Sequence, residues 1–199
     1  MALQTSAQVV GRLRRAGSGG WLRVAVTGCA ALAVALALLA HALTPSPDLT
    51  QRLIGHAAPT FTAPVAQSGH LLAHPARVAG ANGNPTLLVF FNTLCVHCLS
   101  GVQIAQSVAQ TSSAGAVNVV YLDAPGENAQ ITGNYMARLR ADPPVLLDHG
   151  AKIASAYGVT YYPSFVLVDA RGVIRATWTG SPSVDAIRSA IAAAQQAGA

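Results

Sequence analysis

Apolar residues in the second half of the chain fall into short continuous runs, separated by polar, Gly- and Pro-containing segments. Such runs are typical of buried strands in an α/β domain. Leu87–Phe91 is one of them and predicts a strand. From Val96 to about Gln110 the apolar positions recur at helical spacing, which predicts a helix. A second strand is expected over Ala116–Asp123, so these three elements form a β-α-β unit with a parallel crossover.

Downstream, the same alternation continues. The pattern predicts, in order, a helix, a short strand, a helix, two hairpin strands and a last helix, over Asn128–Arg140, Val145–Leu147, Gly150–Tyr157, Ser164–Asp169, Val173–Thr179 and Ser183–Gln196. The hairpin makes the sheet mixed. Upstream, Ala57–Pro64 is proline-punctuated and predicts an edge strand or an extended arm. Residues 67–84 are expected to be mostly loop, with a weak strand near residues 70–73.

The hydropathy pattern changes near the N-terminus. Val24–Leu43 is a run of 20 residues without Asp, Glu, Lys or Arg, long enough to cross a bilayer as a helix. Four arginines precede it, and Asp48 is the first charged residue after it. The positive-inside rule then makes residues 1–23 a basic cytoplasmic tail and residues 24–43 a single-pass anchor in the cell membrane. A signal peptide, either cleaved or uncleaved, is the alternative.

Under this topology everything after the span is extracytoplasmic. Residues 44–56 are expected to be a linker and residues 57–199 the folded domain. The chain has a net charge of +5, but four of its 12 basic residues precede the span. The remainder is almost balanced in charge, so the basicity belongs to the tail and nucleic-acid binding is not expected.

Candidate chemistry is concentrated where the first strand ends. Asn92-Thr93 breaks the apolar run, and Cys95 and Cys98 follow with two residues between them. The pattern places Cys95 at the mouth of a helix N-terminus and Cys98 about one turn inside the helix. Free backbone N–H groups and the helix dipole stabilise a thiolate there, and protonated His97 adds a positive charge. A low thiol pKa also makes the corresponding disulfide a stronger oxidant.

The cysteine pair has two alternative interpretations. A disulfide that closes so short a loop restricts the unfolded chain little, so a purely structural staple is disfavoured. A zinc site needs a second pair of ligands. The only other cysteine, Cys29, lies in the membrane-like segment, and the remaining histidines, including His70 and His74, are scattered singly. Redox chemistry therefore remains as the favoured reading.

Taken together, these features resemble the membrane-anchored TlpA/ResA/DsbE group of bacterial thiol-disulfide oxidoreductases. Four stretches carry the resemblance, which covers about residues 57–197: Ala58–Phe61, Phe90–Cys98, Pro144–Val159 and Pro163–Gly172. The resemblance implies a thioredoxin-like three-layer α/β/α sandwich with a central mixed sheet, preceded by one transmembrane helix.

The resemblance also assigns roles. It implies that Cys95 is the attacking cysteine, that Cys98 resolves the mixed disulfide, and that Pro163 follows a cis peptide bond which aims Tyr162 and its backbone at the substrate. It implies no metal or cofactor beyond the redox-active Cys95–Cys98 disulfide. The implied partners are protein thiols or disulfides, either in unfolded secreted proteins or in apocytochrome c during cytochrome c biogenesis, and a membrane electron donor or acceptor.

Several positions depart from related proteins. His97 stands where the group often has proline, as in strongly oxidising DsbA-like motifs. Val89 replaces the buried acid of thioredoxins, and Gly101 replaces the glutamate of some ResA-like proteins. With no nearby anion expected to raise the thiol pKa, the pair is predicted to be moderately to strongly oxidising.

Two alternative functions use the same cysteines. Ala58–Phe61 also resembles the start of peroxiredoxins, but Asn92 stands where peroxide activation needs Thr or Ser, and Leu88 stands at the expected proline. A soft-metal carrier, for example of copper, would use Cys95, Cys98 and His97. No further ligand for such a metal is identifiable in the sequence.

Overall fold

The computed structural model describes residues 32–35, 49–78, 83–112, 116–126 and 128–198. The chain divides into two compact units, residues 1–46 and 47–199. In the first unit only the helical residues 32–35 are described, so most of the predicted anchor over residues 24–43 lies outside the described residues. Within the described ranges, no helix is both long and apolar enough to cross a membrane.

The second unit is built on a seven-stranded mixed sheet. Its strand order is β3-β2-β7-β6-β5-β8-β9, and a separate pair, β1 (Phe61–Ala63) and β4 (Ala76–Val78), is antiparallel. The strands of the large sheet are β2 (Val65–Gln67), β3 (His70–Leu71), β5 (Thr86–Phe91), β6 (Asn118–Asp123), β7 (Val145–Leu147), β8 (Ser164–Val168) and β9 (Ile174–Thr179). Among the described strands of this sheet, the neighbouring pairs β5–β6 and β6–β7 are parallel, and the other neighbouring pairs are antiparallel.

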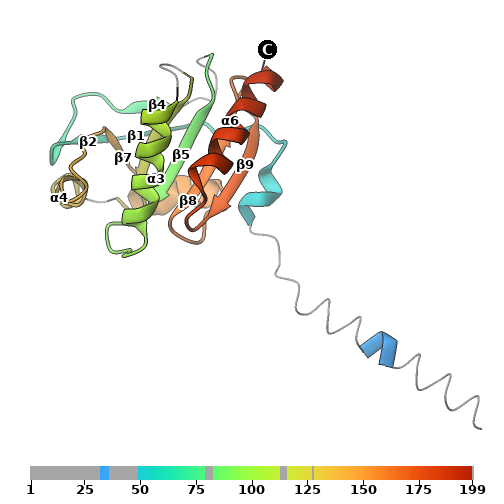
Figure 1. The fold of residues 1–199 in the computed structure, drawn as a ribbon. Helices are drawn as coiled ribbons and strands as arrows, with labels where there is room; N and C mark the ends of the chain where they lie inside the picture. Colours follow the sequence, from blue (N-terminus) through green and yellow to red (C-terminus); the bar gives the residue numbers. More distant parts are fainter. Residues whose placement is uncertain (1–31, 36–48, 79–82, 113–115, 127, 199) are drawn as a thin grey trace, which may run out of the picture. The chain divides into compact units, whose positions relative to one another are not determined.

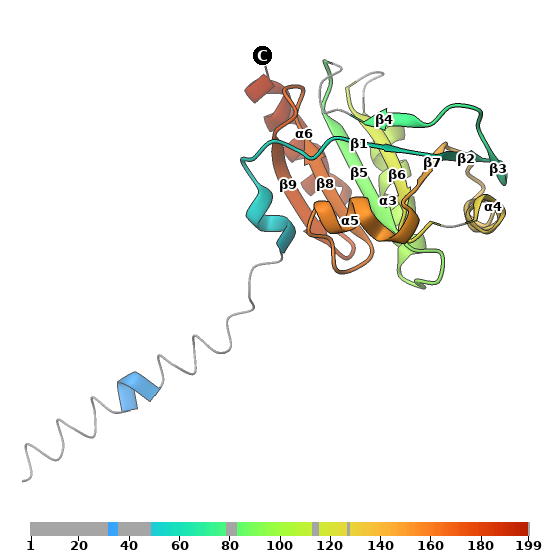
Figure 2. The ribbon, with the colours of Figure 1, turned by 180° about the vertical axis from the view of Figure 1, so that it is seen from behind.

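Helices cover both faces of this sheet. In Figure 1, α3 (Cys98–Thr111) and α6 (Val184–Gly198) lie in front of the strands, and Figure 2 shows α5 (Lys152–Ala156) across the opposite face. The fourth helix, α4 (Ala129–Ala137), packs beside the β2–β3 edge. The expected three-layer thioredoxin-like sandwich is therefore confirmed for this unit.

Strand β5 explains why the sheet has two cores. All six of its residues are buried, and successive side chains point to opposite faces. Leu87, Val89 and Phe91 belong to the core beneath α3 and α6, whereas Leu88 and Phe90 belong to the core that holds Tyr157. A strand that is buried on both faces must be apolar at every position, which is the run seen in the sequence.

Some boundaries differ from those predicted. Within residues 67–84, β3 confirms the weak strand predicted near residues 70–73, whereas β4 was not predicted. The helix predicted over residues 150–157 is a 3-10 turn (His149–Ala151) followed by the short α5, because Gly150 and Ala151 have positive φ. A further 3-10 helix, η1 (Leu49–Leu53), lies in the predicted linker, and its buried Thr50 hydroxyl donates to the Gly158 carbonyl.

Candidate active site

The two cysteines lie on a tight loop at the carboxyl end of β5, at the lower end of the unit in Figure 1. Asn92 organises this loop. Its side-chain oxygen accepts from the Leu94 N–H at 2.7 Å, and its amide nitrogen donates to the Ala124 carbonyl at 3.0 Å. Its backbone carbonyl accepts from the Cys95 N–H at 3.0 Å. The cysteine loop is thereby tied to the end of the neighbouring strand β6.

The helix begins later than predicted. Cys98 is the first residue of α3 and His97 is its N-cap, so Cys98 does not lie one turn inside the helix. The reason is local: the Cys98 N–H donates to the Cys95 carbonyl at 3.2 Å, which closes a turn immediately before the helix. Cys95 therefore precedes the first helical residue by three positions.

The cysteines differ in accessibility. The Cys95 side chain is partly exposed, and its thiol donates to the Tyr162 carbonyl at 3.6 Å. Cys98 is fully buried and hydrogen-bonds the Cys95 side chain. Burial, followed by that hydrogen bond, raises the pKa of Cys98 to about 12, although the Asn92 backbone amide acts in the opposite direction. At neutral pH Cys98 is therefore held as a thiol.

Pro163 packs directly beside the pair. The Tyr162–Pro163 peptide bond is cis. Gly101, on the first turns of α3, approaches Pro163 so closely that a β-carbon at residue 101 would lie 2.7 Å from the proline ring. This contact gives a physical reason for glycine at the position where some ResA-like proteins carry glutamate. Burial raises the pKa of the Tyr162 phenol, with the charges of Asp148, Cys98 and Asp123 adding to the effect.

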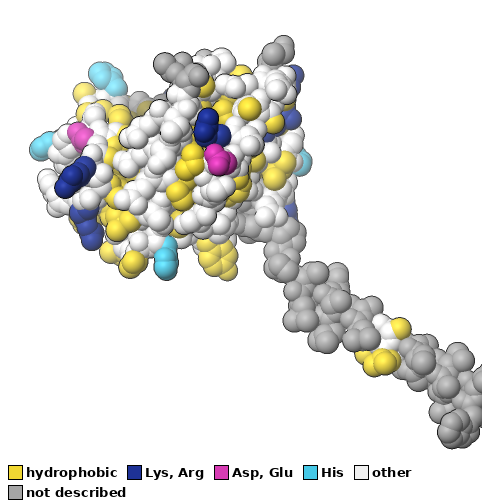
Figure 3. All heavy atoms as spheres, in the orientation of Figure 1, with side chains coloured by type: hydrophobic (Ala, Val, Ile, Leu, Met, Phe, Trp, Pro, Cys, Tyr) yellow, Lys and Arg dark blue, Asp and Glu magenta, His cyan; other side chains and the backbone are white. Residues whose placement is uncertain are grey.

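Apolar side chains surround the accessible cysteine. Leu94 and Val96, which flank Cys95 in the chain, are 89% and 80% exposed, and Tyr161 is 68% exposed. His97 is exposed as well, and its side chain makes no capping hydrogen bond. Figure 3 shows apolar side chains protruding at this lower end of the unit, where charged side chains are sparse.

A buried carboxyl group near the cysteines was not predicted. Asp123 ends β6 and is 2% exposed, and its charge contributes to the raised pKa of Cys98. The expectation that no nearby anion acts on the thiols is therefore wrong. The signal that could have found it is an acid closing an apolar strand, since the carboxyl ends of neighbouring parallel strands meet at the same edge of the sheet.

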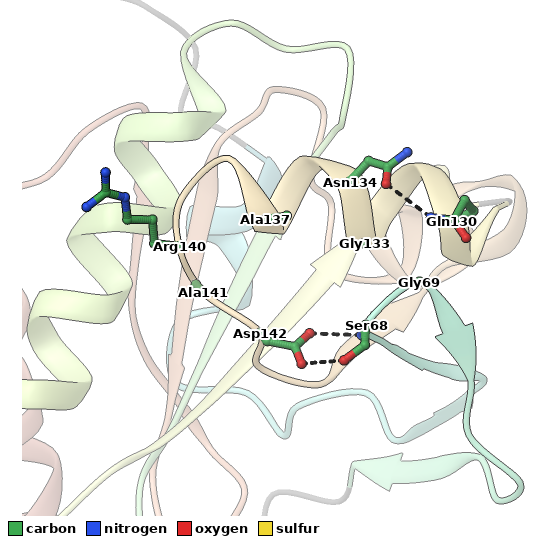
Figure 4. A pocket seen from close by; sticks show the side chains of 9 residues that line it. All are labelled: Ser68, Gly69, Gln130, Gly133, Asn134, Ala137, Arg140, Ala141 and Asp142. Carbon is green, nitrogen blue, oxygen red and sulfur yellow. Dashed lines mark hydrogen bonds between the residues drawn. The ribbon is translucent and has the colours of Figure 1, made fainter.

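A pocket lies elsewhere on this unit. It has a volume of about 380 Å³ and lies between α4 and the β2–β3 turn (Figure 4). There the Asp142 carboxylate accepts two hydrogen bonds from Ser68, one from its backbone N–H and one from its hydroxyl. The Arg140 side chain points away from the pocket. None of the predicted site residues lines it. Among the described residues, no three His, Cys, Asp or Glu side chains are grouped to hold a metal ion.

Comparison with known proteins identifies the family. Residues 54–177 match the AhpC/TSA family. The chain belongs to this family. A curated relative, the methylamine utilization protein MauD of Paracoccus versutus, is 32% identical over 124 residues, which is 62% of this chain and 57% of that protein. The chain thus spans little more than half the length of this relative.

Solved structures share the fold. A thiol:disulfide interchange protein DsbE from Chlorobium tepidum has a TM-score of 0.61 at 21% identity, covering 71% of this chain and 97% of its own. StoA from Bacillus subtilis has a TM-score of 0.54 at 18% identity, covering 67% and 96%. The resemblance to the thioredoxin-like thiol-disulfide oxidoreductases drawn from the sequence is confirmed at the level of family and fold.

Proposed function

We propose that the domain catalyses thiol-disulfide exchange on protein substrates through Cys95 and Cys98. The observation that carries this proposal is the pairing of one accessible and one buried cysteine beside a cis proline. Cys95 can reach a sulfur atom of another molecule, whereas Cys98, with 0% exposure, can reach only Cys95. This asymmetry supports Cys95 as the attacking thiol and Cys98 as the resolving thiol.

The reaction consists of two exchanges. Cys95 thiolate attacks a substrate disulfide, and a mixed disulfide forms while one substrate sulfur leaves as a thiolate. Cys98 then attacks the Cys95 sulfur, releasing the second substrate sulfur and leaving a Cys95–Cys98 disulfide. The two-residue spacing gives Cys98 a high effective concentration. In the oxidising direction the same steps run in reverse.

The surroundings of Cys95 favour an extended, apolar polypeptide as the substrate. Leu94, Val96 and Tyr161 offer apolar contact area around the sulfur, and the backbone at Tyr162 lies within reach of it. Unfolded secreted proteins and apocytochrome c both supply such segments. The fold shared with a protein named for thiol:disulfide interchange supports this class of reaction.

A trapping experiment tests this function. In the full-length chain, Cys98→Ser is expected to accumulate mixed disulfides with client proteins, because the resolving thiol is missing. Cys95→Ser is the matched control and is expected to form none, since the remaining thiol is buried. Equal trapping by both variants, or trapping by neither, would refute the assignment of roles.

The direction of the reaction depends on the reduction potential. His97 is exposed and lies between the two cysteines in the chain, where a positive charge on its ring would stabilise a Cys95 thiolate, so we propose that it favours an oxidising couple. Equilibration of the full-length chain with glutathione should then give about −120 to −180 mV, and His97→Ala should lower the potential. A value near or below about −270 mV would instead identify a reductant.

We also propose that the domain works outside the cytoplasm, held by an uncleaved anchor over residues 24–43. The 20-residue run without Asp, Glu, Lys or Arg and the four arginines before it support this topology. A membrane electron donor or acceptor would then recycle the cysteine pair. Protease added outside intact spheroplasts should digest the domain, whereas a protected domain would contradict the topology.

Family membership also keeps peroxide reduction as a second candidate, which the cysteine loop disfavours. Asn92 stands where a peroxide-activating hydroxyl is expected, and its side chain is used in two hydrogen bonds that shape the loop. We expect hydrogen peroxide to oxidise the reduced protein no faster than it oxidises a free thiol. Rapid turnover of peroxide would overturn this expectation.

A further inference from the structure

The buried acid Asp123 lies at the inner side of the cysteine loop. It is the last residue of β6 and pairs in register with Phe91, the last residue of β5. Asn92 follows directly; its side chain bonds the Ala124 carbonyl, and its backbone amide bonds the Cys98 sulfur. These links connect Asp123 to Cys98, the buried thiol of the cysteine pair.

Asp123 is incompletely paired. Its Oδ2 accepts from the Thr132 hydroxyl, but among the described residues no group meets hydrogen-bond geometry at Oδ1. The hydroxyl of Tyr135, which is 3% exposed and stacked on Phe91, also has no such partner in the described part of the chain. Buried polar atoms are rarely left unpaired, and those that are often serve chemistry.

The surroundings of Asp123 favour proton exchange at its carboxyl group. The titratable groups that face it are Cys95, Cys98, Tyr135 and Tyr162, together with Asp148 near Tyr162 and the exposed Arg138, whose guanidinium lies 5.9 Å from the centre of the Tyr135 ring. Burial raises the pKa of Asp123, and the Thr132 hydroxyl and the Thr93 backbone amide offset this only in part. A carboxylate with a raised pKa is a better base than an ordinary one.

The resolving step needs such a base. Cys98 must lose its proton before it can attack, yet burial keeps it protonated. Thioredoxins use an acid on the strand that precedes the cysteines, and Val89 occupies that position here. Asp123 lies at the end of the neighbouring strand, and its charge acts on the same thiol.

Resting on the thiol-disulfide exchange proposed above, we propose that Asp123 takes the proton of Cys98 when Cys98 resolves the mixed disulfide. The Cys98 sulfur forms its bond to the Cys95 sulfur as the S–H proton passes to the Asp123 carboxylate. The bond between Cys95 and the substrate sulfur breaks, and its electron pair leaves with the substrate as a thiolate, which later takes a proton from solvent. In the reverse reaction the protonated Asp123 returns the proton to Cys98 as Cys98 leaves.

The two steps can be timed separately with the reduced full-length chain and an aromatic disulfide that releases a coloured thiolate. The first release reports the attack of Cys95, and the second reports its displacement by Cys98. Asp123→Asn should slow the second release by about 10²-fold, as expected for loss of a general base, and leave the first within about threefold. The pH profile of the second release should lose its acidic limb, which follows deprotonation of Asp123.

Asp148→Asn is the matched control. Asp148 is a buried carboxylate that follows the adjacent strand β7, but its two oxygens accept from the backbone N–H groups of Ile153 and Ala154. This variant should keep the wild-type pH profile. An Asp123→Asn protein whose second release keeps the wild-type rate and profile would overturn the inference. Absence of both releases in the wild-type chain would instead refute the proposed function itself.

Thr132→Val keeps the test decisive if Asp123→Asn does not fold. This variant retains the carboxylate but removes the hydroxyl that donates to it. Because that hydrogen bond lowers the pKa of Asp123, its loss should move the acidic limb of the second release to higher pH. An unmoved limb would mean that Asp123 does not control the step.

Discussion

Asp123 and Asp169 are both buried aspartates at strand ends, but the pKa of Asp123 is raised and the pKa of Asp169 is lowered. Asp169 follows β8, and its Oδ1 accepts from the backbone N–H groups of Arg171 and Val173. Its Oδ2 forms an ion pair with Arg175 at 2.6 Å. Burial alone would raise its pKa, but these donors outweigh it and hold the pKa below the ordinary value of 3.8.

Asp123 has fewer donors, the Thr132 hydroxyl and the Thr93 backbone amide, and its pKa is raised. The difference shows that burial alone does not decide the charge of a carboxyl group. The number of hydrogen-bond donors that point at it decides whether its pKa is raised or lowered. A fully paired carboxylate holds a turn together. An underpaired one at the edge of a reactive site remains able to exchange a proton.

The largest expected effect on stability is at Asp169. Asp169→Asn removes the charge that pairs with Arg175 and weakens the hydrogen bonds that close the β8–β9 turn. Hydrogen bonds to charged groups contribute about 1.5–3 kcal/mol. We therefore expect the free energy of unfolding of this variant, measured with urea at pH 7, to be about 2 kcal/mol lower than that of the wild type. A loss below about 0.5 kcal/mol would mean that the turn does not depend on this charge.

A smaller effect is expected at Asp148, which caps α5 rather than pairing with a cation. Its two oxygens accept from the Ile153 and Ala154 N–H groups at 2.8 Å each, and an Asn side chain can retain only one of these bonds. Asp148→Asn should therefore lower the free energy of unfolding by about 1 kcal/mol, the usual magnitude for a helix cap. Urea unfolding measures it, and Ser155→Ala, at an exposed position on the same helix, is the control that leaves both Asp148 hydrogen bonds in place and should not destabilise the protein.

Asp123 also illustrates which features of the fold the sequence could predict. The pattern predicted the β-α-β unit, the hairpin, the last helix and the mixed sheet, because each depends on local hydrophobic periodicity. It missed β4 because that strand is defined by pairing with the distant β1. It missed the contact between Asp123 and the cysteine loop for a similar reason: the contact depends on the register of β5 against β6, which no local spacing records.

The position of the helix start shows a second limit. Helical periodicity begins at Val96, but side-chain spacing does not reveal that Asn92 and Cys95 carbonyls close turns before α3. The cysteine motif itself was evident from sequence. The burial that separates the two thiols follows from the packing of Cys98 in the core beneath α3 and α6, which is a property of the whole fold.

The effect that separates the two aspartates most directly is the pH dependence of stability. Because the pKa of Asp123 is higher in the folded state than in the unfolded state, the folded protein binds that proton more tightly. This contribution to stability is present below pH 3.8 and is lost as the pH rises through the folded-state pKa. For Asp169 the pKa is lowered, so its contribution is present above pH 3.8 and is lost as the pH falls through the folded-state value.

The free energy of unfolding of wild type and of Asp123→Asn should be measured with urea between pH 4 and 8. As the pH rises, the variant should become more stable relative to the wild type, by at most about 1.4 kcal/mol per pH unit. The Asp169→Asn difference should stay level over this range, because the lowered pKa lies beneath it. Parallel pH dependence for the two variants would mean that Asp123 is as fully paired as Asp169. If the carboxyl group of Asp123 ionised at the same pH in the folded and unfolded states, folding would not make it a stronger base toward Cys98.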